Sequence, residues 1–252
     1  MKTSTISIFS AVALVTAAAH GATLSIADAV SSANGSVINI DNTGGLDWSI
    51  WKKPGTTDAS LGVATNSKAS SSAISDLFIV GAANSEFRAS TSSTPDWDFT
   101  YTGGVNAPAS STLTDVNGVF HPVLRTVGNG VGLTVTLPTT GTYQITLYVA
   151  GYDTTSQLRA TLPGLADPVL NNSFAPGFPV SSVKRMGIFT IEATADTAGD
   201  LLNLQLTNTS DSNENAHVMI TAAAVQLIPE PSAMALAALA GGLALARRRR
   251  LH

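Results

Sequence analysis

The residues whose types and spacing predict chemistry most clearly lie in the last 24 positions of the chain. They are, in order, Pro229, Glu230, Pro231, an uncharged small-residue run over 232–246, and the basic residues Arg247, Arg248, Arg249 and Arg250. The two prolines keep the backbone around Glu230 out of a helix and extended, as a processing enzyme requires of its substrate. Arginine is costly inside a bilayer, so the basic cluster stays in the cytoplasm and the polar motif stays at the outer surface. The segment 229–252 is therefore predicted to be a membrane-sorting signal.

This tail resembles the PEP-CTERM sorting signal of bacterial secreted proteins, on the Pro229-Glu230-Pro231 motif, the Ala/Leu/Gly run and the terminal arginines. The resemblance implies that an exosortase recognises the tail and processes it near the Pro-Glu-Pro motif. It also implies an association with exopolysaccharide, in bacteria with an outer membrane. It covers about a tenth of the chain. It predicts the destination of the protein and not the activity of the body.

A permanent transmembrane anchor is the alternative for the same tail. The run 232–246 has 15 residues, so a helix there reaches about 22 Å. A bilayer core is about 30 Å thick and usually takes about 20 apolar residues. The run is a marginal span, which favours a transient stay in the cytoplasmic membrane before processing.

The N-terminus has the pattern of an export signal. Lys2 precedes an uncharged apolar run over 6–19, and small residues follow at Ala19, Gly21 and Ala22. Such a run with small residues behind it is typical of a leader that signal peptidase removes. We expect a signal peptide over 1–21, export by the secretion machinery, and a body over 22–228 that reaches the cell envelope, the cell surface or the medium.

The composition of the body excludes several classes of protein. It carries eight basic and sixteen acidic residues, a net charge of −8, which argues against nucleic acid as a partner. The chain has no cysteine, so neither disulfides nor thiolate chemistry contribute. With 44% hydrophobic residues, the body is expected to fold around a hydrophobic core without a cofactor.

Alternation of apolar and polar residues predicts an all-β fold, a single β-sandwich or jelly roll. The period of two is clearest over 131–137 and 143–149, which we interpret as a hairpin around the turn 138–141. Further strands are expected over 158–162, 187–193, 202–206 and 217–227, and in the first half over 37–40, 46–51, 76–80 and 96–101. Strands at regular spacing without helical patterns are typical of such sandwiches.

Three of these segments are similar to strands of bacterial galactose-binding-like β-sandwiches. They are Gly45-Leu46-Asp47-Trp48-Ser49-Ile50-Trp51, Ile145-Thr146-Leu147-Tyr148-Val149-Ala150-Gly151 and the segment from Val218 to Val225. Lys52, Lys53 and Pro54 stand where that family has a glycine, which is a departure from the pattern. The resemblance implies a fold, and a sugar ligand only as one of many uses of that fold.

The aromatic residues are the candidates for a glycan-binding face, and Trp48, Trp51 and Trp97 come first. In an extended strand Trp48 and Trp51 point to opposite faces. We therefore expect at most one of them to be buried and the other to be accessible for stacking on a sugar ring.

Catalytic and metal-binding patterns are sparse. Asp96 and Asp98 flank Trp97, and such a pair is more often a solvated face than a glycosidase pair. Asp211, Asn213 and Asn215 alternate as calcium-loop ligands do but lack the glycine and glutamate of such a loop, so we expect a polar hairpin connection there. His121 and His217 stand in no recognisable triad.

The sequence thus predicts an exported, non-enzymatic protein that is structural or matrix-associated. A carbohydrate-binding module is the alternative, and an enzyme acting on polysaccharide would lack any motif. No catalytic residue and no metal site are assigned.

Overall fold

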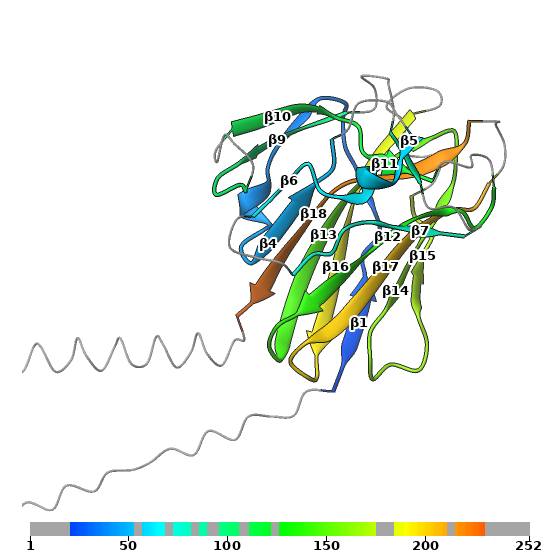
Figure 1. Cartoon of the computed structure of the whole chain (residues 1–252). Coiled ribbons are helices and arrows are strands. Elements are labelled where there is room, and N and C mark those ends of the chain that lie inside the picture. The colour runs from blue at the N-terminus through cyan, green and yellow to red at the C-terminus, as the bar shows by residue number, and fades with distance from the viewer. Residues whose placement is uncertain are drawn as a thin grey trace, which may run out of the picture.

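The computed structural model describes residues 21–52, 57–68, 73–81, 86–89, 96–105, 111–121, 126–174, 184–210 and 215–229. Strands dominate the described part of the chain, with two short 3-10 helices, η1 (Ile40–Asn42) and η2 (Ala59–Gly62). The predicted all-β fold class is confirmed in this part of the chain (Figure 1). The predicted signal peptide 1–21 lies outside the described residues apart from Gly21, and so does the tail beyond Pro229.

The strands form three sheets. The largest has ten strands: β1 (Thr23–Ile26), β2 (Val30–Ser31), β4 (Asp47–Ile50), β5 (Thr57–Asp58), β6 (Asn66–Ser67), β8 (Phe87–Ala89), β11 (Val119–Phe120), β13 (Gly141–Tyr152), β16 (Lys184–Ala195) and β18 (His217–Ile228). The second has five: β7 (Phe78–Val80), β12 (Gly130–Leu137), β14 (Ser156–Thr161), β15 (Val169–Asn171) and β17 (Asp200–Asn208). The third has three: β3 (Ser36–Asn39), β9 (Trp97–Tyr101) and β10 (Ser111–Val116).

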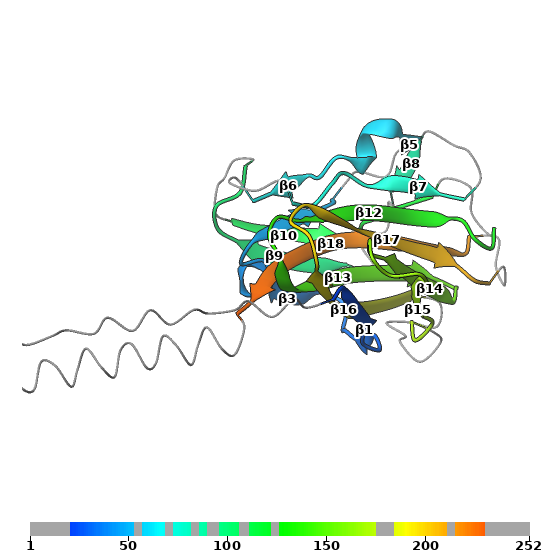
Figure 2. The ribbon, with the colours of Figure 1, turned by 90° about the horizontal axis from the view of Figure 1, so that it is seen from below.

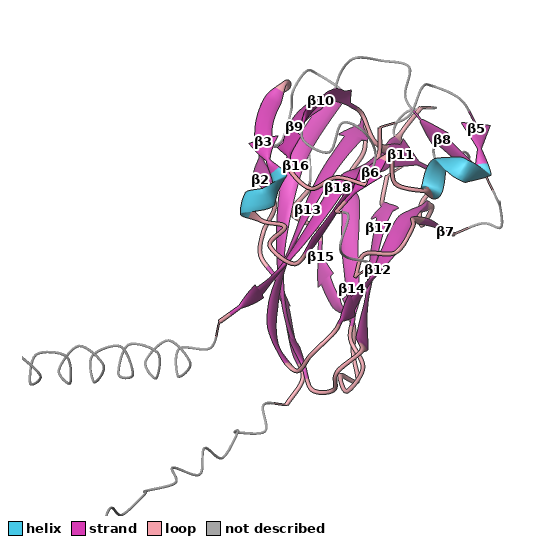
Figure 3. Ribbon diagram, turned by 60° about the vertical axis from the view of Figure 1, so that its left-hand side comes forward, coloured by secondary structure: helices cyan, strands magenta, loops and turns pink. Residues whose placement is uncertain are grey.

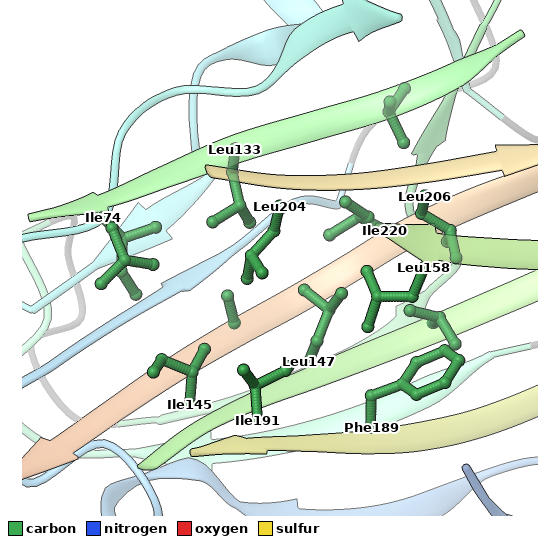
Figure 4. Packing of buried hydrophobic residues seen from close by; sticks show 14 of the residues in the cluster. Ile74, Leu133, Ile145, Leu147, Leu158, Phe189, Ile191, Leu204, Leu206 and Ile220 are labelled. Carbon is green, nitrogen blue, oxygen red and sulfur yellow. The ribbon is translucent and has the colours of Figure 1, made fainter. Parts of the chain in front are cut away.

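The main hydrophobic core lies between the ten-stranded and the five-stranded sheet. Leu133 and Leu204 enter it from the five-stranded sheet, and Ile145, Ile191 and Ile220 enter it from the ten-stranded sheet (Figure 4). All five side chains are fully buried. Two sheets that face each other across one core form a sandwich arrangement, in which each strand turns every second side chain inward.

The predicted hairpin over 131–149 is wrong. Strand β12 pairs with β17 and β7, whereas β13 pairs with β16 and β18, so the turn 138–140 carries the chain from one sheet to the other. In Figure 2 the two strands lie in different layers. Both strands direct their odd-numbered apolar residues into the same core, and they therefore face each other across it. Alternation predicted which residues are buried but not which strands are neighbours.

Tyr143 holds this turn between the sheets. Its hydroxyl accepts a hydrogen bond from the backbone N–H of Thr139 at 3.0 Å and donates one to the carbonyl of Thr139 at 2.9 Å. The ring of Tyr143 is buried in the main core. One side chain thus links the turn to the core of the sandwich.

The second face of the ten-stranded sheet is also covered. A smaller hydrophobic cluster lies between this face and the three-stranded sheet, and it contains Trp48, Trp97, Phe99 and Tyr148. Figure 3 shows β9, β10 and β3 gathered over one end of the large sheet. The ten-stranded sheet is therefore apolar on both faces where the third sheet covers it.

The three segments that resemble galactose-binding-like strands are neighbours in this large sheet. Strand β18 pairs with β13 on one side and with β4 on the other, with Ala222 opposite both Tyr148 and Ile50. Segments about 170 and 70 residues apart in the sequence thus lie side by side. The other strands expected beyond 158 are confirmed as β14, β16, β17 and β18, and those of the first half as β3, β4, β7 and β9.

Candidate functional site

The predicted sorting signal begins where a central strand of the body ends. Strand β18 runs to Ile228, which pairs with Thr142 of β13, and Gln226 pairs with Gln144. The Gln226 side-chain amide donates to Oε1 of Gln144 at 2.5 Å. The strand is therefore held by β13 up to the residue before Pro229.

The N-terminal end of the described chain lies at the same pole. Thr23 of β1 pairs with Thr194 of β16, and Thr194 pairs with Thr142 of β13, opposite Ile228. These four residues form one row across four adjacent strands, about 14 Å from end to end at the usual strand spacing. Figure 1 shows both ends of the coloured chain leaving this pole. We call it the terminal pole.

Hydroxyl groups join the strands of the terminal pole. Thr23 donates from Oγ1 to Oγ1 of Thr194 at 2.8 Å, and the hydroxyls of Thr142 and Thr194 lie 3.1 Å apart. Sequence reasoning missed these threonines, because a threonine in a strand has no local signal that distinguishes it. Only the pairing of β1, β16 and β13 brings them together.

Most of the predicted sorting residues lie outside the described part of the chain. Pro229 is exposed at its end, whereas Glu230, Pro231 and the arginines Arg247, Arg248, Arg249 and Arg250 lie beyond it. Among the described residues, no helix has the length and apolar character needed to cross a membrane. The run 232–246 lies outside the described residues.

The three tryptophans are buried, each with 0% of its surface exposed. The expectation that either Trp48 or Trp51 is accessible is wrong. They do point to opposite faces of the large sheet, but Trp51 lies in the main core and Trp48 in the cluster under the three-stranded sheet. In this conformation none of the three offers a ring face to a sugar.

Hydrogen bonds and ring contacts give these indoles structural roles. Nε1 of Trp48 donates to Oδ1 of Asp41 at 3.1 Å, and Nε1 of Trp51 donates to the carbonyl of Gly62 at 2.9 Å. The ring of Trp97 packs edge-on against Tyr148, with centroids 5.5 Å apart. Buried aromatic rings with such geometry stabilise a core.

The carboxylates beside Trp97 differ in their environments. Asp96 is buried, and its pKa is raised by burial and then by the nearby charges of Asp115 and Asp98. Asp98 is half-buried and accepts the backbone N–H of Asp115 at 3.1 Å. The two carboxylates thus do not form an open pair across a substrate cleft.

The polar segment before β18 does not connect a hairpin. Strand β17 belongs to the five-stranded sheet and β18 to the ten-stranded sheet, so the expected hairpin is wrong and the segment crosses between sheets. Asp211 and Asn213 lie outside the described residues, whereas Asn215 lies inside them and its carbonyl lies 2.5 Å from Nδ1 of His217. Within the described ranges, no three His, Asp or Glu side chains are grouped so as to hold a metal ion.

The two histidines lie near one cavity at the pole opposite the chain ends. His121 and His217 both line it. The imidazole of His217 stacks on Phe120 with centroids 3.9 Å apart, and burial lowers its pKa to about 4. Nδ1 of His121 lies 3.4 Å from Nδ2 of Asn129.

The class defined so far is an all-β body whose last strand leads into a predicted membrane-sorting tail. Residues 227–250 match the family of the PEP-CTERM protein-sorting motif. The chain thus carries this motif, which overlaps the last two residues of β18. No relative was found among curated proteins.

Two solved structures show a limited likeness. The enzymatically active domain of tailspike protein 4 from bacteriophage CBA120 is 15% identical, with 60% of this chain and 19% of that chain covered and a TM-score of 0.31. CBM35 from Cellvibrio japonicus Abf62 is 9% identical, with 61% of this chain and 99% of that chain covered and a TM-score of 0.27. At these scores neither structure supports an argument about function.

Proposed function

We propose that this chain is an exported surface protein whose body, 22–228, is a single non-enzymatic β-sandwich domain. An exosortase-type enzyme processes the tail near Pro229-Glu230-Pro231 while 232–246 is held in the cytoplasmic membrane. The released body then serves a structural, matrix-associated role in the cell envelope or outside the cell, together with exopolysaccharide.

The observation that carries the proposal is the sorting motif over 227–250, joined directly to the last strand of the body. A motif of this family has no catalytic function of its own; it directs a protein to a processing enzyme. The terminal pole supports the same reading, because Thr23 and Ile228 lie three strands apart on one end of the large sheet. A leader and a tail attached at one pole let the body fold on one side of the membrane.

The body itself favours a structural role. Its large exposed hydrophobic side chains are all aliphatic among the described residues, for example Val30 and Leu170. Glycan-binding faces depend on exposed aromatic rings, and the three tryptophans are buried. The aromatic rings nearest the surface in the described ranges, Phe78 and Tyr152, are half-buried, so the carbohydrate-binding alternative has no exposed aromatic side chain there to support it.

The test is the intact mass of the protein recovered from cells of an exosortase-bearing host. We expect a form that has lost 1–21 and the tail, and a Glu230→Ala variant that keeps its tail and accumulates in the membrane. Asp167→Ala, at an exposed position between β14 and β15, is the matched control for loss of one carboxylate. Normal maturation of Glu230→Ala, with the wild-type mass and location, would contradict sorting by this motif.

A glycan array with the recovered mature protein addresses the role of the body. The structural proposal expects no array glycan to bind in the submillimolar range. Saturable binding to one glycan would instead establish the carbohydrate-binding alternative.

A further inference from the structure

The chain contains three Asn-Gly pairs, and they differ in exposure. They are Asn34-Gly35, Asn117-Gly118 and Asn129-Gly130. Both residues of the first pair are exposed, whereas Asn117 is 7% exposed and Asn129 is 4% exposed. A glycine after asparagine leaves its own backbone nitrogen open to the side-chain amide carbon, because no Cβ stands in the way. Such pairs are the ones most prone to lose the side-chain amide.

The exposed pair lies in a surface turn directly before β3. The backbone N–H of Ser36 donates to the carbonyl of Ala33 at 3.2 Å, so Asn34 and Gly35 are the two central residues of this turn. Gly35 has a φ of 68°, a left-handed conformation that favours glycine. A Cβ added at Gly35 would meet no atom within 4 Å. The turn therefore has open space around it.

Two hydrogen bonds to Asp96 hold the turn. The N–H of Gly35 donates to the carbonyl of Asp96 at 3.1 Å, and the N–H of Asp96 donates to Oδ1 of Asn34 at 3.1 Å. Both distances lie at the long end of the usual range. The turn must release both bonds before the nitrogen of Gly35 reaches the amide carbon of Asn34. Local openings of a surface turn cost little free energy compared with global unfolding.

The other two pairs lie where the backbones of strands are packed together. A Cβ added at Gly118 would lie 2.6 Å from the carbonyl oxygen of Ile220 on β18, and one at Gly130 would lie 1.9 Å from that of Leu206 on β17. Gly130 is also the first residue of β12 and pairs with Thr207. Ring closure at either buried asparagine therefore requires that β18 or β17 moves away.

From this arrangement we propose that Asn34-Gly35 is a site of slow spontaneous deamidation in the folded body. The backbone nitrogen of Gly35 forms a bond to Cγ of Asn34, and the side-chain amide nitrogen leaves as ammonia with the proton from Gly35. Water then opens the resulting succinimide ring at either carbonyl, which gives aspartate or isoaspartate at position 34. Water is the only co-reactant of this step. The modification goes beyond the sorting role, because it concerns the body itself.

The carboxylate formed at position 34 lies beside other carboxylates. Asp96 is buried, and its Oδ1 has no hydrogen-bond partner in the described part of the chain. Burial raises the pKa of Asp96, and the nearby charges of Asp115 and Asp98 raise it further. A new negative charge next to Asp96 adds to this repulsion. Since β3 begins at Ser36 and is the last strand of the three-stranded sheet, we expect the modification to loosen β3.

The experiment follows the three pairs in the full-length protein in detergent during incubation at mildly alkaline pH. Peptide mapping with mass spectrometry measures the conversion at each asparagine. In the folded protein we expect Asn34 to react at least about tenfold faster than Asn117 or Asn129. In urea the three rates should become similar, because the difference arises from the fold. No reaction at Asn34, an equal rate at a buried pair in the folded protein, or a difference that persists in urea would overturn the proposal.

The variant Asn34→Asp tests the effect on the third sheet, since it introduces the charge of the product directly. Hydrogen exchange of the β3 amides should be about fivefold faster than in the wild-type protein. Asn172→Asp is the matched control, because it adds the same charge at another exposed asparagine, beside Gln157 of β14, and should leave β3 unchanged. Unchanged exchange of β3 in Asn34→Asp, or equal acceleration by both variants, would refute the effect of the modification on β3.

Discussion

At the scale of single residues, the side chains that looked most available for ligands turn out to hold the fold together. Trp48 and Trp51 are buried on opposite faces of one sheet, and their N–H groups bond to Asp41 and to the carbonyl of Gly62. Asp96 is buried with a raised pKa, for which burial is the main cause. The indole N–H groups of Trp48 and Trp51 are thus used by the protein itself.

Replacing Tyr143 by Phe should destabilise the protein by about 1–2 kcal/mol, because the hydroxyl's bonds to the backbone of Thr139 are lost. For a body of this size that lowers Tm by about 2–8 °C. The measurement is thermal melting followed by circular dichroism. Tyr152→Phe is the control, since no described residue is seen to form a hydrogen bond with the Tyr152 hydroxyl. Equal melting of the two variants would refute the role of Tyr143.

Acid should weaken the fold through His217. Burial, with a smaller contribution from the charge of Arg88, lowers the pKa of His217 to about 4 in the folded protein, against 6.5 ordinarily. The unfolded chain therefore takes up the proton first, so stability is complete above pH 6.5 and falls as the pH drops from 6.5 towards 4. The free energy of unfolding should decrease by about 2–3 kcal/mol over that range.

Denaturant titrations of the wild-type protein and of His217→Gln at pH 7, 5.5 and 4.5 measure this dependence. The variant should lose most of the slope, because it has no group to protonate at this position. If the dependence of stability on pH is unchanged in His217→Gln, it arises from other groups.

At the scale of elements, the alternation of apolar and polar residues within a segment predicts a strand. Which strands pair depends on segments elsewhere in the chain. β12 and β13 are neighbours in sequence, yet they lie in different sheets and turn their odd-numbered residues into one core from opposite sides. At some positions the backbones of two paired strands lie so close together that only glycine fits. A Cβ added at Gly130 of β12 would lie 1.9 Å from the carbonyl oxygen of Leu206 on β17.

Gly130→Ala should therefore cost about 3 kcal/mol, since the contact can be relieved only by moving the β12–β17 pair. Gly45→Ala is the matched control, because a Cβ there meets Gln226 Cβ at an ordinary 3.8 Å. Urea unfolding of both variants provides the comparison. Equal midpoints for the two would show that β12 and β17 are not held as closely as described.

At the scale of the whole molecule, the sandwich separates two poles. The terminal pole carries Thr23 and Ile228, while Arg185 of β16 and Asn208 of β17 lie at the opposite pole. Strand β13 has 12 residues, which separates the poles by about 36 Å. The chain ends and the opposite pole are thus kept apart by the length of the core.

The short distance between the body and the processing motif should limit the rate of processing. Because β18 is paired through Ile228, an enzyme that needs extended chain around Glu230 must first detach the end of the strand. A four-residue Gly-Ser insertion between Ile228 and Pro229 should speed maturation about fivefold, the equivalent of about 1 kcal/mol of local opening. Pulse-chase measurement of the mature fraction tests this.

The control is the same insertion after Gly103, at an open position in a turn. It should leave the rate of maturation unchanged. If the insertion before Pro229 has no effect or slows maturation, the enzyme does not require β18 to open.

Chelation should leave the fold intact. No group of His, Asp or Glu in the described ranges is arranged to hold a metal ion, so we expect EDTA to shift Tm by less than about 5 °C, a change that would correspond to roughly 1–2 kcal/mol of metal linkage. A larger drop would point to calcium at the polar segment with Asp211, Asn213 and Asn215. Re-addition of calcium distinguishes that outcome from a non-specific effect of the chelator.

The sequence by itself determined the sorting motif, the all-β class and most strand positions. These properties are local: a motif is a run of adjacent residues, and a strand shows its period of two over five or six positions, as in Val131, Leu133 and Val135. The match of 227–250 to the sorting motif and the position of β12 agree with that reading. Alternation also correctly placed Trp48 and Trp51 on opposite faces.

The tertiary structure decided what covers each face and which ends meet. Whether Trp48 is exposed depends on the three-stranded sheet, whose strands β3, β9 and β10 come from separate parts of the chain. The row from Thr23 to Ile228 and the contacts of Thr154 with Arg185 and Asn208 likewise join residues far apart in sequence. Pairing and burial are set by the free energy of packing whole sheets together, which no local pattern contains.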